Sequence, residues 1–257
     1  MTERFVDSKV YDENYYYYNL PKEMHDAPYE NLPGRILEIF KMREVEPGMR
    51  VLDIGMGRGE LCVYAVRRGG EAWGIDYSEV AVKIAEKYKI NLPDDIQSKI
   101  HYQQGNAKAL EFSDNFFDLI TMTDVVEHLY PEELEKAFNE IKRVLKPGGR
   151  LLLQTAPNRW YTQYGYWIYY LFRKLNDNST VAHPRDEINE IVHVNEQSVP
   201  QLKSMLKKIK FKDFKISLRH PPLQTKNPIR KFGYMIFYKS PLKYILSHGI
   251  FAWAEKG

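Results

Sequence analysis

The sequence predicts an α/β fold in which helices cover both faces of a largely parallel sheet. Between residues 50 and 155, short apolar runs alternate with amphipathic stretches, and glycine or proline separates many of them. Strands that alternate with helices at this spacing form parallel units that are buried on both faces. Because ligands of such sheets bind at the carboxyl ends of the strands, we expect a site in the loops there.

Each predicted element has a local signal in the sequence. The apolar strand candidates are residues 51–54, 72–75, 117–122 and 151–153. The helix candidate at 61–66 stops at the glycine pair 69–70, and Ser78 can cap the next helix. Pro131 opens a third helix, and the run PGG at 147–149 stops it before the last of these strands.

The composition is that of a globular protein, but its charge is unevenly distributed. Of the 257 residues, 44% are apolar and 28% are charged, which excludes a disordered or fibrous chain. The formal net charge is +3, yet residues 201–257 carry 13 Lys and Arg against 2 Asp and Glu. Such a basic tail is either a solvated face or a docking site for an anionic partner.

Three further features bear on the compartment. The single cysteine, Cys62, excludes an intrachain disulfide and an all-cysteine metal site. The polar start at residues 1–7 is unlike a signal peptide. The most apolar run, 164–172, is shorter than the roughly 18 residues that span a bilayer. We therefore expect a cytoplasmic protein.

The loop after the first strand, DIGMGRGE at 53–60, has the composition of a ligand-binding turn. Its glycines permit unusual backbone angles and close approach of a ligand. A dinucleotide loop needs the spacing G-x-G-x-x-G, and here Glu60 stands where its third glycine would be. Two acids, Asp53 and Glu60, disfavour a pyrophosphate and favour a cationic ligand with an amino group.

The pattern D-x-G-x-G-x-G at 53–59 resembles motif I of the class I S-adenosylmethionine (SAM) methyltransferases. Four more segments resemble this family in order: GIDYS at 74–78, QGNA at 104–107, FFDLI at 116–120 and LKPGGRL at 145–151. The resemblance covers about residues 35–160. It implies a Rossmann-like, seven-stranded mixed sheet of order 3-2-1-4-5-7-6, with a sixth strand at 212–219 and an antiparallel seventh at 249–254. The alternative is a Rossmann-like protein that binds another ligand.

The same resemblance implies one methyltransferase domain over residues 1–257. Its parts are an N-terminal lid at 1–46, a SAM-binding core at 47–156, an acceptor-cap insertion at 157–200 and the C-terminal part of the sheet at 201–257. The last part contains a basic, aromatic insertion at 225–247.

The resemblance also implies SAM as cofactor, with S-adenosylhomocysteine as product. Asp76 would accept hydrogen bonds from both ribose hydroxyls, and Tyr77 would lie against adenine. Asn106 stands where the family usually has aspartate, and its carbonyl can still accept a hydrogen bond from the adenine amino group. The other cofactor-binding candidates are Asp53, Gly55, Gly57, Gly59, Ala107, Asp124 and Val125.

Two histidines are the catalytic candidates. Methyl transfer is a direct displacement that depends on positioning, and an oxygen or nitrogen acceptor can also need a base. His128 lies in a loop that runs beside the methionine end of SAM in the family, and the alternative is a histidine that only binds backbone. His193 resembles a histidine that faces the acceptor, and the alternative is a residue at the entry of a helix capped by Ser198.

A divalent metal is a less favoured possibility. The pattern D-x-x-E-H at 124–128 resembles the E-x-x-E-H of ubiquinone-pathway O-methyltransferases and small-RNA 2′-O-methyltransferases, which binds a divalent cation. The ligands would be Asp124, Glu127, His128 and His193, a mixture that suits Mg²⁺, Mn²⁺ or Zn²⁺. Many relatives with the E-H-L sequence use no metal.

Aromatic clusters suggest an acceptor surface. The tyrosines at 15–18, with Tyr16 and Tyr18 as candidates, can attract a sulfonium by cation–π contact or simply pack on the core. Trp160, Tyr164 and Trp167 follow the fifth strand and can stack on a sugar or aromatic ring. The same residues could instead lie on a membrane surface or form a dimer face.

The sequence therefore predicts methyl transfer from SAM to a small-molecule, sugar or lipid-linked acceptor at oxygen, most like the ubiquinone-biosynthesis group (methyltransferase types 11 and 12). No N-P-P-Y or D-P-P-Y follows the fourth strand, which argues against exocyclic amines of DNA bases, and no RNA-binding module is recognisable. The alternatives are a methyltransferase acting on RNA or another polyanion, and a non-catalytic SAM-binding regulator. For partners, the sequence suggests peripheral contact with an anionic membrane, which is favoured over nucleic acid. A homodimer is a further expectation.

Overall fold

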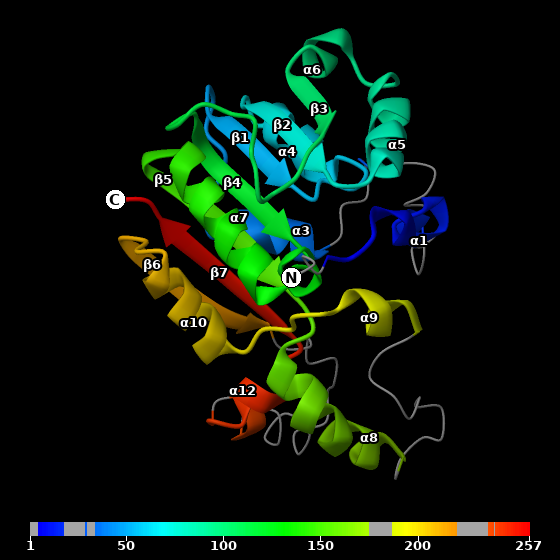
Figure 1. Cartoon of the computed structure of the whole chain (residues 1–257), viewed down its shortest axis with the longest axis vertical. Helices are drawn as coiled ribbons and strands as arrows, with labels where there is room; N and C mark the ends of the chain where they lie inside the picture. The colour runs from blue at the N-terminus through cyan, green and yellow to red at the C-terminus, as the bar shows by residue number, and fades with distance from the viewer. Residues whose placement is uncertain (1–4, 18–28, 30–33, 175–186, 220–235, 239) are drawn as a thin grey trace.

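A computed structural model describes residues 5–17, 29, 34–174, 187–219, 236–238 and 240–257. It contains a seven-stranded sheet of order β3-β2-β1-β4-β5-β7-β6, which confirms the predicted fold class and strand order (Figure 1). The strands are β1 (Arg50–Ile54), β2 (Glu71–Asp76), β3 (Ile100–Gln104), β4 (Phe117–Thr123), β5 (Leu145–Thr155), β6 (Asp213–Arg219) and β7 (Gly249–Glu255). The neighbouring pairs from β3 to β5 are parallel, and β7 is antiparallel to both of its neighbours.

Helices connect and flank these strands. The regular helices are α1 (Glu13–Tyr17), α3 (Gly34–Phe40), α4 (Glu60–Arg67), α5 (Glu79–Lys89), α6 (Asp94–Gln97), α7 (Pro131–Val144), α8 (Tyr166–Lys174), α9 (Glu187–Val192), α10 (Val199–Lys208) and α12 (Lys243–Leu246). Three short turns complete them: the 3-10 turns η1 (Ser8–Val10) and η2 (Val126–His128), and the π-helical turn η3 (Tyr161–Gly165). In the described part of the chain, no helix is long and apolar enough to cross a membrane.

The sheet is buried on both faces because successive strand residues point to opposite sides. In β1, Leu52 and Ile54 belong to the apolar cluster that contains the buried faces of α7 and α10. Val51, which precedes Leu52 and so points to the opposite side of the sheet, belongs to the second cluster, with α3 and α4. Apolar residues at consecutive strand positions are therefore required here, and they produce the uninterrupted runs seen in the sequence.

The basic tail is an integral part of this sheet. β7 lies between β5 and β6, with Leu151 opposite Ala254 and Ile216 opposite Ala252. The sixth and seventh strands begin and end within one residue of the predicted bounds. In the described part of the tail, much of the excess positive charge is thus carried by α10, by β6 and by the residues between them.

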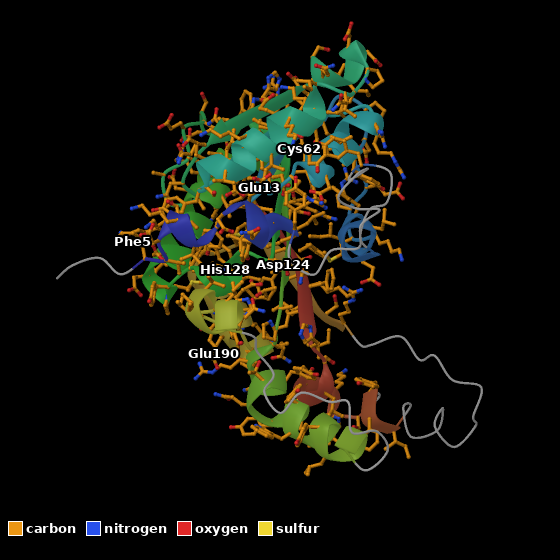
Figure 2. The ribbon with its side chains drawn as sticks, turned by 90° about the vertical axis from the view of Figure 1, so that its right-hand side faces the viewer. Phe5, Glu13, Cys62, Asp124, His128 and Glu190 are labelled. Atoms are coloured by element: carbon orange, nitrogen blue, oxygen red, sulfur yellow. The ribbon has the colours of Figure 1, made fainter. Side chains whose placement is uncertain are left out.

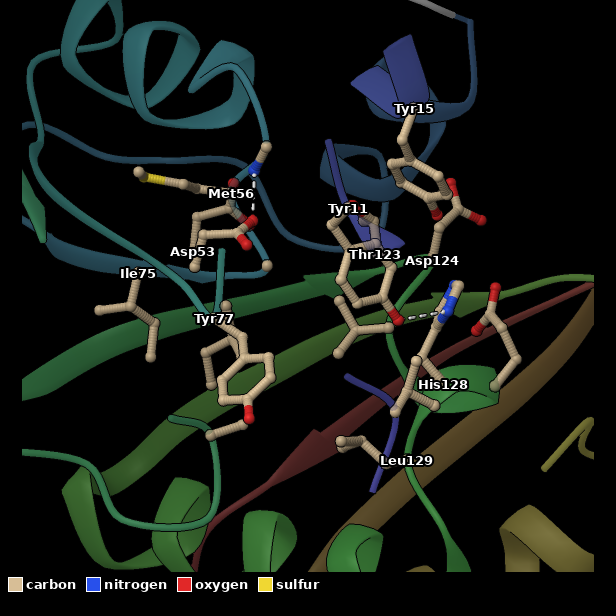
Figure 3. A pocket seen from close by; sticks show the side chains of 18 of the residues that line it. Tyr11, Tyr15, Asp53, Met56, Ile75, Tyr77, Thr123, Asp124, His128 and Leu129 are labelled. Atoms are coloured by element: carbon tan, nitrogen blue, oxygen red, sulfur yellow. Dashed lines mark hydrogen bonds between the residues drawn. The ribbon is translucent and has the colours of Figure 1, made fainter. Parts of the chain in front are cut away.

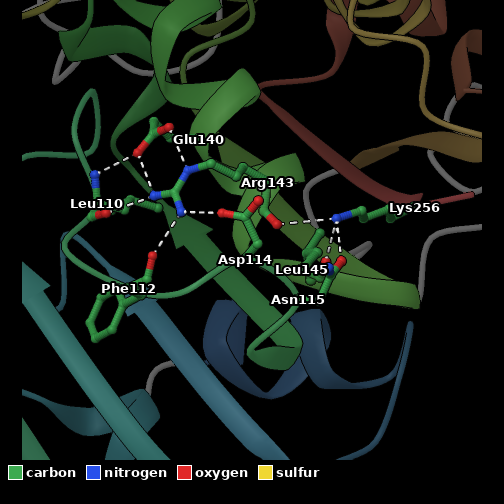
Figure 4. Close-up of polar contacts among 8 residues, drawn as sticks. All are labelled: Leu110, Phe112, Asp114, Asn115, Glu140, Arg143, Leu145 and Lys256. Carbon is green, nitrogen blue, oxygen red and sulfur yellow. Dashed lines mark hydrogen bonds and ion pairs between the residues drawn. The ribbon is translucent and has the colours of Figure 1, made fainter.

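A polar network fixes the loop between β3 and β4 (Figure 4). Arg143 of α7 donates to the carbonyl oxygens of Leu110 and Phe112 at 2.7 Å each, and to the carboxylates of Asp114 and Glu140. Glu140 in turn accepts the backbone N–H of Leu110 at 2.8 Å. Since charged hydrogen bonds are the stronger kind, this network holds the loop that begins just after Gly105 against the sheet.

Candidate functional site

A cavity of about 560 Å³ opens at the carboxyl ends of β1, β2 and β4, where the parallel sheet was expected to bind a ligand (Figure 3). Its size is within the usual range for small-molecule sites. Most of the predicted cofactor-binding residues line it: Asp53, Gly55, Gly57, Asp76, Tyr77, Asn106, Ala107, Asp124 and Val125. Gly59 is the exception among them.

The glycine loop needs glycine for backbone conformation and for space. Gly55, Gly57 and Gly59 have φ values of +72°, +54° and +84°, in the region that other residues rarely adopt. A Cβ on Gly55 would collide with Val125, and one on Gly59 would collide with the hydroxyl of Tyr102. Gly59 therefore serves the packing of the loop on β3, and its neighbours form the cavity wall.

Asp53 is a buried acid, and no positively charged side chain is hydrogen-bonded to it among the described residues. Its Oδ1 accepts the hydroxyl of Thr121 at 2.7 Å, and its Oδ2 receives no hydrogen bond from the described residues. Burial, together with the charges of Glu60 and Asp76, raises the pKa of Asp53 to about 8. A cationic ligand in the cavity would offset this cost and lower the pKa of Asp53 again.

Asp76 ends β2 and ties the glycine loop to the next helix. Its Oδ2 accepts the N–H of Gly57 at 3.0 Å, and its Oδ1 accepts the N–H of Ser78 at 2.9 Å and the hydroxyl of Tyr16 at 3.3 Å. Burial raises its pKa. Asn106, across the cavity, accepts the N–H of Lys108 through Oδ1 at 3.0 Å, and that oxygen keeps a second lone pair.

The N-terminal segment lies over these loops, which is where the predicted lid would be. The backbone oxygen of Tyr11 accepts the hydroxyl of Ser78 at 2.9 Å, and the hydroxyls of Tyr17 and Tyr88 are 2.9 Å apart. Tyr11, Tyr15 and Tyr16 line the cavity. Figure 2 shows the segment marked by Phe5 and Glu13 above the loop with Asp124 and His128, with Glu190 of α9 below it.

Both predicted catalytic histidines line the cavity: His128 comes from the loop after β4, and His193 directly follows α9. The rings of His128 and His193 lie 5.1 Å apart between centroids, although the two residues come from distant parts of the chain. The hydroxyl oxygen of Tyr11 is 3.1 Å from Nδ1 of His128 (Figure 3). Burial, assisted by His193, lowers the pKa of His128 to about 3, so its imidazole is neutral at neutral pH. Asp124, which precedes this loop, has a left-handed φ of +52°.

Three of the four residues considered as metal ligands come together. Donor atoms of Glu127, His128 and His193 all lie within 4.8 Å of one another. Asp124 is not part of that trio. Glu127 is buried, and its carboxylate accepts the hydroxyl of Thr155 at 2.7 Å and the N–H of Ala156 at 3.4 Å. Burial and the charge of Asp124 raise its pKa to about 8.

Of the acceptor-binding candidates within the described residues, only Tyr16 lines the cavity. Trp160, Tyr164 and Trp167 do not line it: they lie on and beside η3 and α8, and Tyr164 and Trp167 face solvent with 56% and 47% exposure. Tyr18 lies outside the described residues, as do most of the insertion at 225–247 and all of the segment 175–186. Direct acceptor binding by these residues stays a prediction.

Several lining residues escaped the sequence reasoning, His248 and Asn189 among them. His248 lies just before β7, and a signal for it existed: an antiparallel strand starts at the edge where its parallel neighbours end, so its N-terminal flank belongs to the site. Asn189 of α9 also lines the cavity, and no motif marks it. Ser198 forms the predicted helix cap of α10, with Gln201 completing a capping box.

The central part of the chain is similar to known proteins. Residues 52–153 match a family model described as a methyltransferase domain. Ubiquinone/menaquinone biosynthesis C-methyltransferases are similar: that of Vibrio vulnificus is 37% identical over 135 residues, 50% of this chain and 51% of the relative. That of Yersinia pestis is 39% identical over 110 residues, 42% of this chain and 43% of the relative. The chain thus spans about half the length of these curated relatives.

Solved structures extend the likeness in fold. The Haemonchus contortus phosphoethanolamine N-methyltransferase 2 with SAM has a TM-score of 0.63 at 20% identity, over 97% of this chain and 57% of that one. The Streptomyces coelicolor geranyl diphosphate C-methyltransferase, in complex with Mg²⁺, geranyl diphosphate and S-adenosylhomocysteine, has a TM-score of 0.62 at 16% identity, over 87% and 79%. At these identities the likeness concerns the fold.

Proposed function

The chain carries a methyltransferase domain of the class I SAM-dependent group at residues 52–153, and on this premise we propose that it transfers a methyl group from SAM to a small-molecule acceptor. One observation carries the proposal. The buried acids Asp53, next to the last residue of β1, and Asp76, the last residue of the neighbouring β2, line one cavity together with the glycine loop. This arrangement provides negative charge for the amino group of SAM. For its ribose, Oδ2 of Asp76 accepts one hydroxyl beside the Gly57 N–H, and Oδ1 accepts the other in exchange for the hydroxyl of Tyr16.

The other lining residues have consistent roles in this proposal. Tyr77 lies against adenine, and the side-chain carbonyl of Asn106 accepts a hydrogen bond from the adenine amino group. Asp124 and Val125, in the strained turn after β4, border the methionine part. Tyr16 already contacts Asp76 and closes the cavity from above the cofactor.

We place the acceptor at the His128–His193 end of the cavity, with oxygen as the preferred methylated atom. The acceptor oxygen forms a bond to the methyl carbon as the bond from that carbon to sulfur breaks, which yields S-adenosylhomocysteine. The hydroxyl proton passes to the imidazole of His128, which is neutral before transfer because burial lowers its pKa. A lowered pKa makes this imidazole a weak base, so it takes the proton as the bond to the methyl carbon forms and the hydroxyl becomes acidic, and not before. Carbon is the second candidate because the curated relatives are named C-methyltransferases. Sugar, lipid-linked and quinone-like acceptors fit equally.

A transfer experiment with labelled cofactor tests this function. Purified protein, SAM carrying a labelled methyl group and cell extract should place label in the small-molecule or lipid fraction. The Asp76→Ala variant is the matched control and should transfer none. Label confined to nucleic acid would instead favour a polyanion substrate. Absence of label in every fraction, despite SAM binding by calorimetry, would favour a regulatory SAM-binding protein.

A divalent cation fits the donors of Glu127, His128 and His193 in number and chemistry, and it would polarise the acceptor hydroxyl. However, both oxygens of Glu127 already accept hydrogen bonds from β5 and the residue after it, and Asp124 stands apart from the trio. We therefore expect activity to stay within about twofold after EDTA dialysis, with no metal found by elemental analysis. Loss of activity that Mg²⁺, Mn²⁺ or Zn²⁺ restores would contradict this and assign the trio as ligands.

A further inference from the structure

Large apolar side chains are concentrated on one end of the molecule. Of the thirteen that the described residues expose, eight lie within 159–174 and 236–247. They are Tyr164, Trp167, Ile168, Leu171, Ile236, Phe237, Leu242 and Tyr244, with exposed fractions from 37% to 61%. We call this set the α8–α12 surface. Figure 1 shows α8 and α12 at the opposite end of the molecule from α5 and α6. Such a concentration indicates an interaction surface.

Buried contacts hold the two helices of this surface together. The side-chain amide of Asn158, which is fully buried, donates to the carbonyl oxygens of Tyr244 and Ser247 at 2.7 Å and 3.0 Å. A Cβ on Gly165 of η3 would collide with the backbone oxygen of Ile245, so η3 and α12 are in direct backbone contact. The exposed apolar residues of η3 and α12 therefore stand on a packed support.

The charge of this surface has one sign. The sequences 159–174 and 236–247 contain no Asp or Glu, but they contain Arg159, Arg173, Lys174, Lys239 and Lys243. Trp and Tyr, which have an apolar body and a polar tip, are the residues enriched where a bilayer meets water. Basic side chains beside them gain from the negative potential of anionic lipids.

We propose that the α8–α12 surface binds the headgroup region of an anionic phospholipid bilayer. Exposed Trp167 and Leu171 would enter the interface, while Arg159 and Lys243 lie at phosphate level. α8 is nine residues long, so it lies on the bilayer and does not cross it.

The surface adjoins the cavity. The ring of Tyr161 in η3 lies 5.2 Å from that of His248, and His248 and Pro157 line the cavity near the two catalytic candidates. A bilayer bound here would therefore lie beside the acceptor end. If the proposed methyl transfer holds, an amphiphilic acceptor drawn from the membrane is the substrate class that this placement favours.

Vesicle co-sedimentation tests the proposal without measuring activity. The full chain should bind vesicles of phosphatidylcholine with about 30% phosphatidylglycerol and should not bind pure phosphatidylcholine. Raising the salt from 0.1 M to 0.5 M should weaken binding, because it screens the basic side chains. Trp167→Ser with Leu171→Ser, and separately Arg159→Glu with Lys243→Glu, should each reduce the affinity at least tenfold.

Matched controls stand at the other surfaces of the molecule. Ile90, which is 67% exposed after α5, and Lys207, which is exposed on α10, carry no contact with the α8–α12 surface. Ile90→Ser and Lys207→Glu should bind vesicles like the unchanged protein. Absence of binding to anionic vesicles, or equal loss in the controls, would overturn the proposal. So would Trp167→Ser with Leu171→Ser converting a dimer to a monomer while vesicle binding is retained, since the surface would then be a contact between two copies.

Discussion

Replacing Asp76 by alanine should weaken SAM binding at least a hundredfold. In the proposed complex its carboxylate accepts both ribose hydroxyls, and a hydrogen bond to a charged group contributes about 1.5–3 kcal/mol. Two such bonds correspond to a hundredfold change in affinity or more, at about 1.4 kcal/mol for each factor of ten. The variant also loses the acceptor of the Gly57 N–H, so the glycine loop is less well held. Isothermal titration calorimetry with SAM measures the change directly.

Asp118 offers a matched control for this variant. Like Asp76 it accepts a backbone N–H, that of Arg50 at 2.9 Å, but it does so at the start of β4, away from the cavity. Asp118→Ala should therefore cost some thermal stability and leave the affinity for SAM within about threefold. An Asp76→Ala protein that is folded by circular dichroism and binds SAM normally would refute the whole cofactor assignment.

The strands and the cofactor wall were predictable because their determinants are local. Alternation of strands and helices makes the sheet parallel, so the carboxyl ends of the strands lie at one edge. The glycines at 55, 57 and 59 each occupy a position with a positive φ in the same turn. Asp53 and Asp76 were identifiable since each ends a strand next to a loop that the chain must turn through. Their position follows from the local pattern, whereas the role of Asp76 toward ribose came from the resemblance to the methyltransferase family.

The acceptor end was less predictable because it depends on contacts between distant segments. The contact between Tyr11 and His128 spans 117 residues, and the pairing of His128 with His193 requires α9 to fold back onto the loop after β4. The aromatic residues at 160–167 have the composition of a binding site, but the packing of η3 on α12 turns several of them to solvent. Composition indicates what a segment can bind; only the fold decides which cavity or surface it meets.

Replacing His128 by glutamine should lower kcat by about 10²–10⁴-fold, the usual contribution of a positioned base, with little change in the affinity for SAM. The side chain lies at the acceptor end, beside Tyr11 and His193, so the effect should fall on turnover and not on cofactor binding. His101→Gln is the control, because His101 pairs with Glu71 across β3 and β2, outside the cavity. Single-turnover kinetics with labelled SAM separates the two quantities. Equal turnover in both variants would remove His128 from the mechanism.

The protonation of His128 gives this assignment a second, independent test. Burial lowers its pKa to about 3, which means that the charged form gains population only as the pH falls toward that value. Between pH 5 and 8 the imidazole should therefore stay neutral, and protonation of His128 should cause no loss of rate on the acid side of that range. Its ring signals in an NMR titration, identified by their absence in His128→Gln, should not shift over the same interval. A titration near the ordinary histidine pKa of about 6.5 would show that water reaches the ring, and would contradict the closed acceptor end in which Tyr11 covers it.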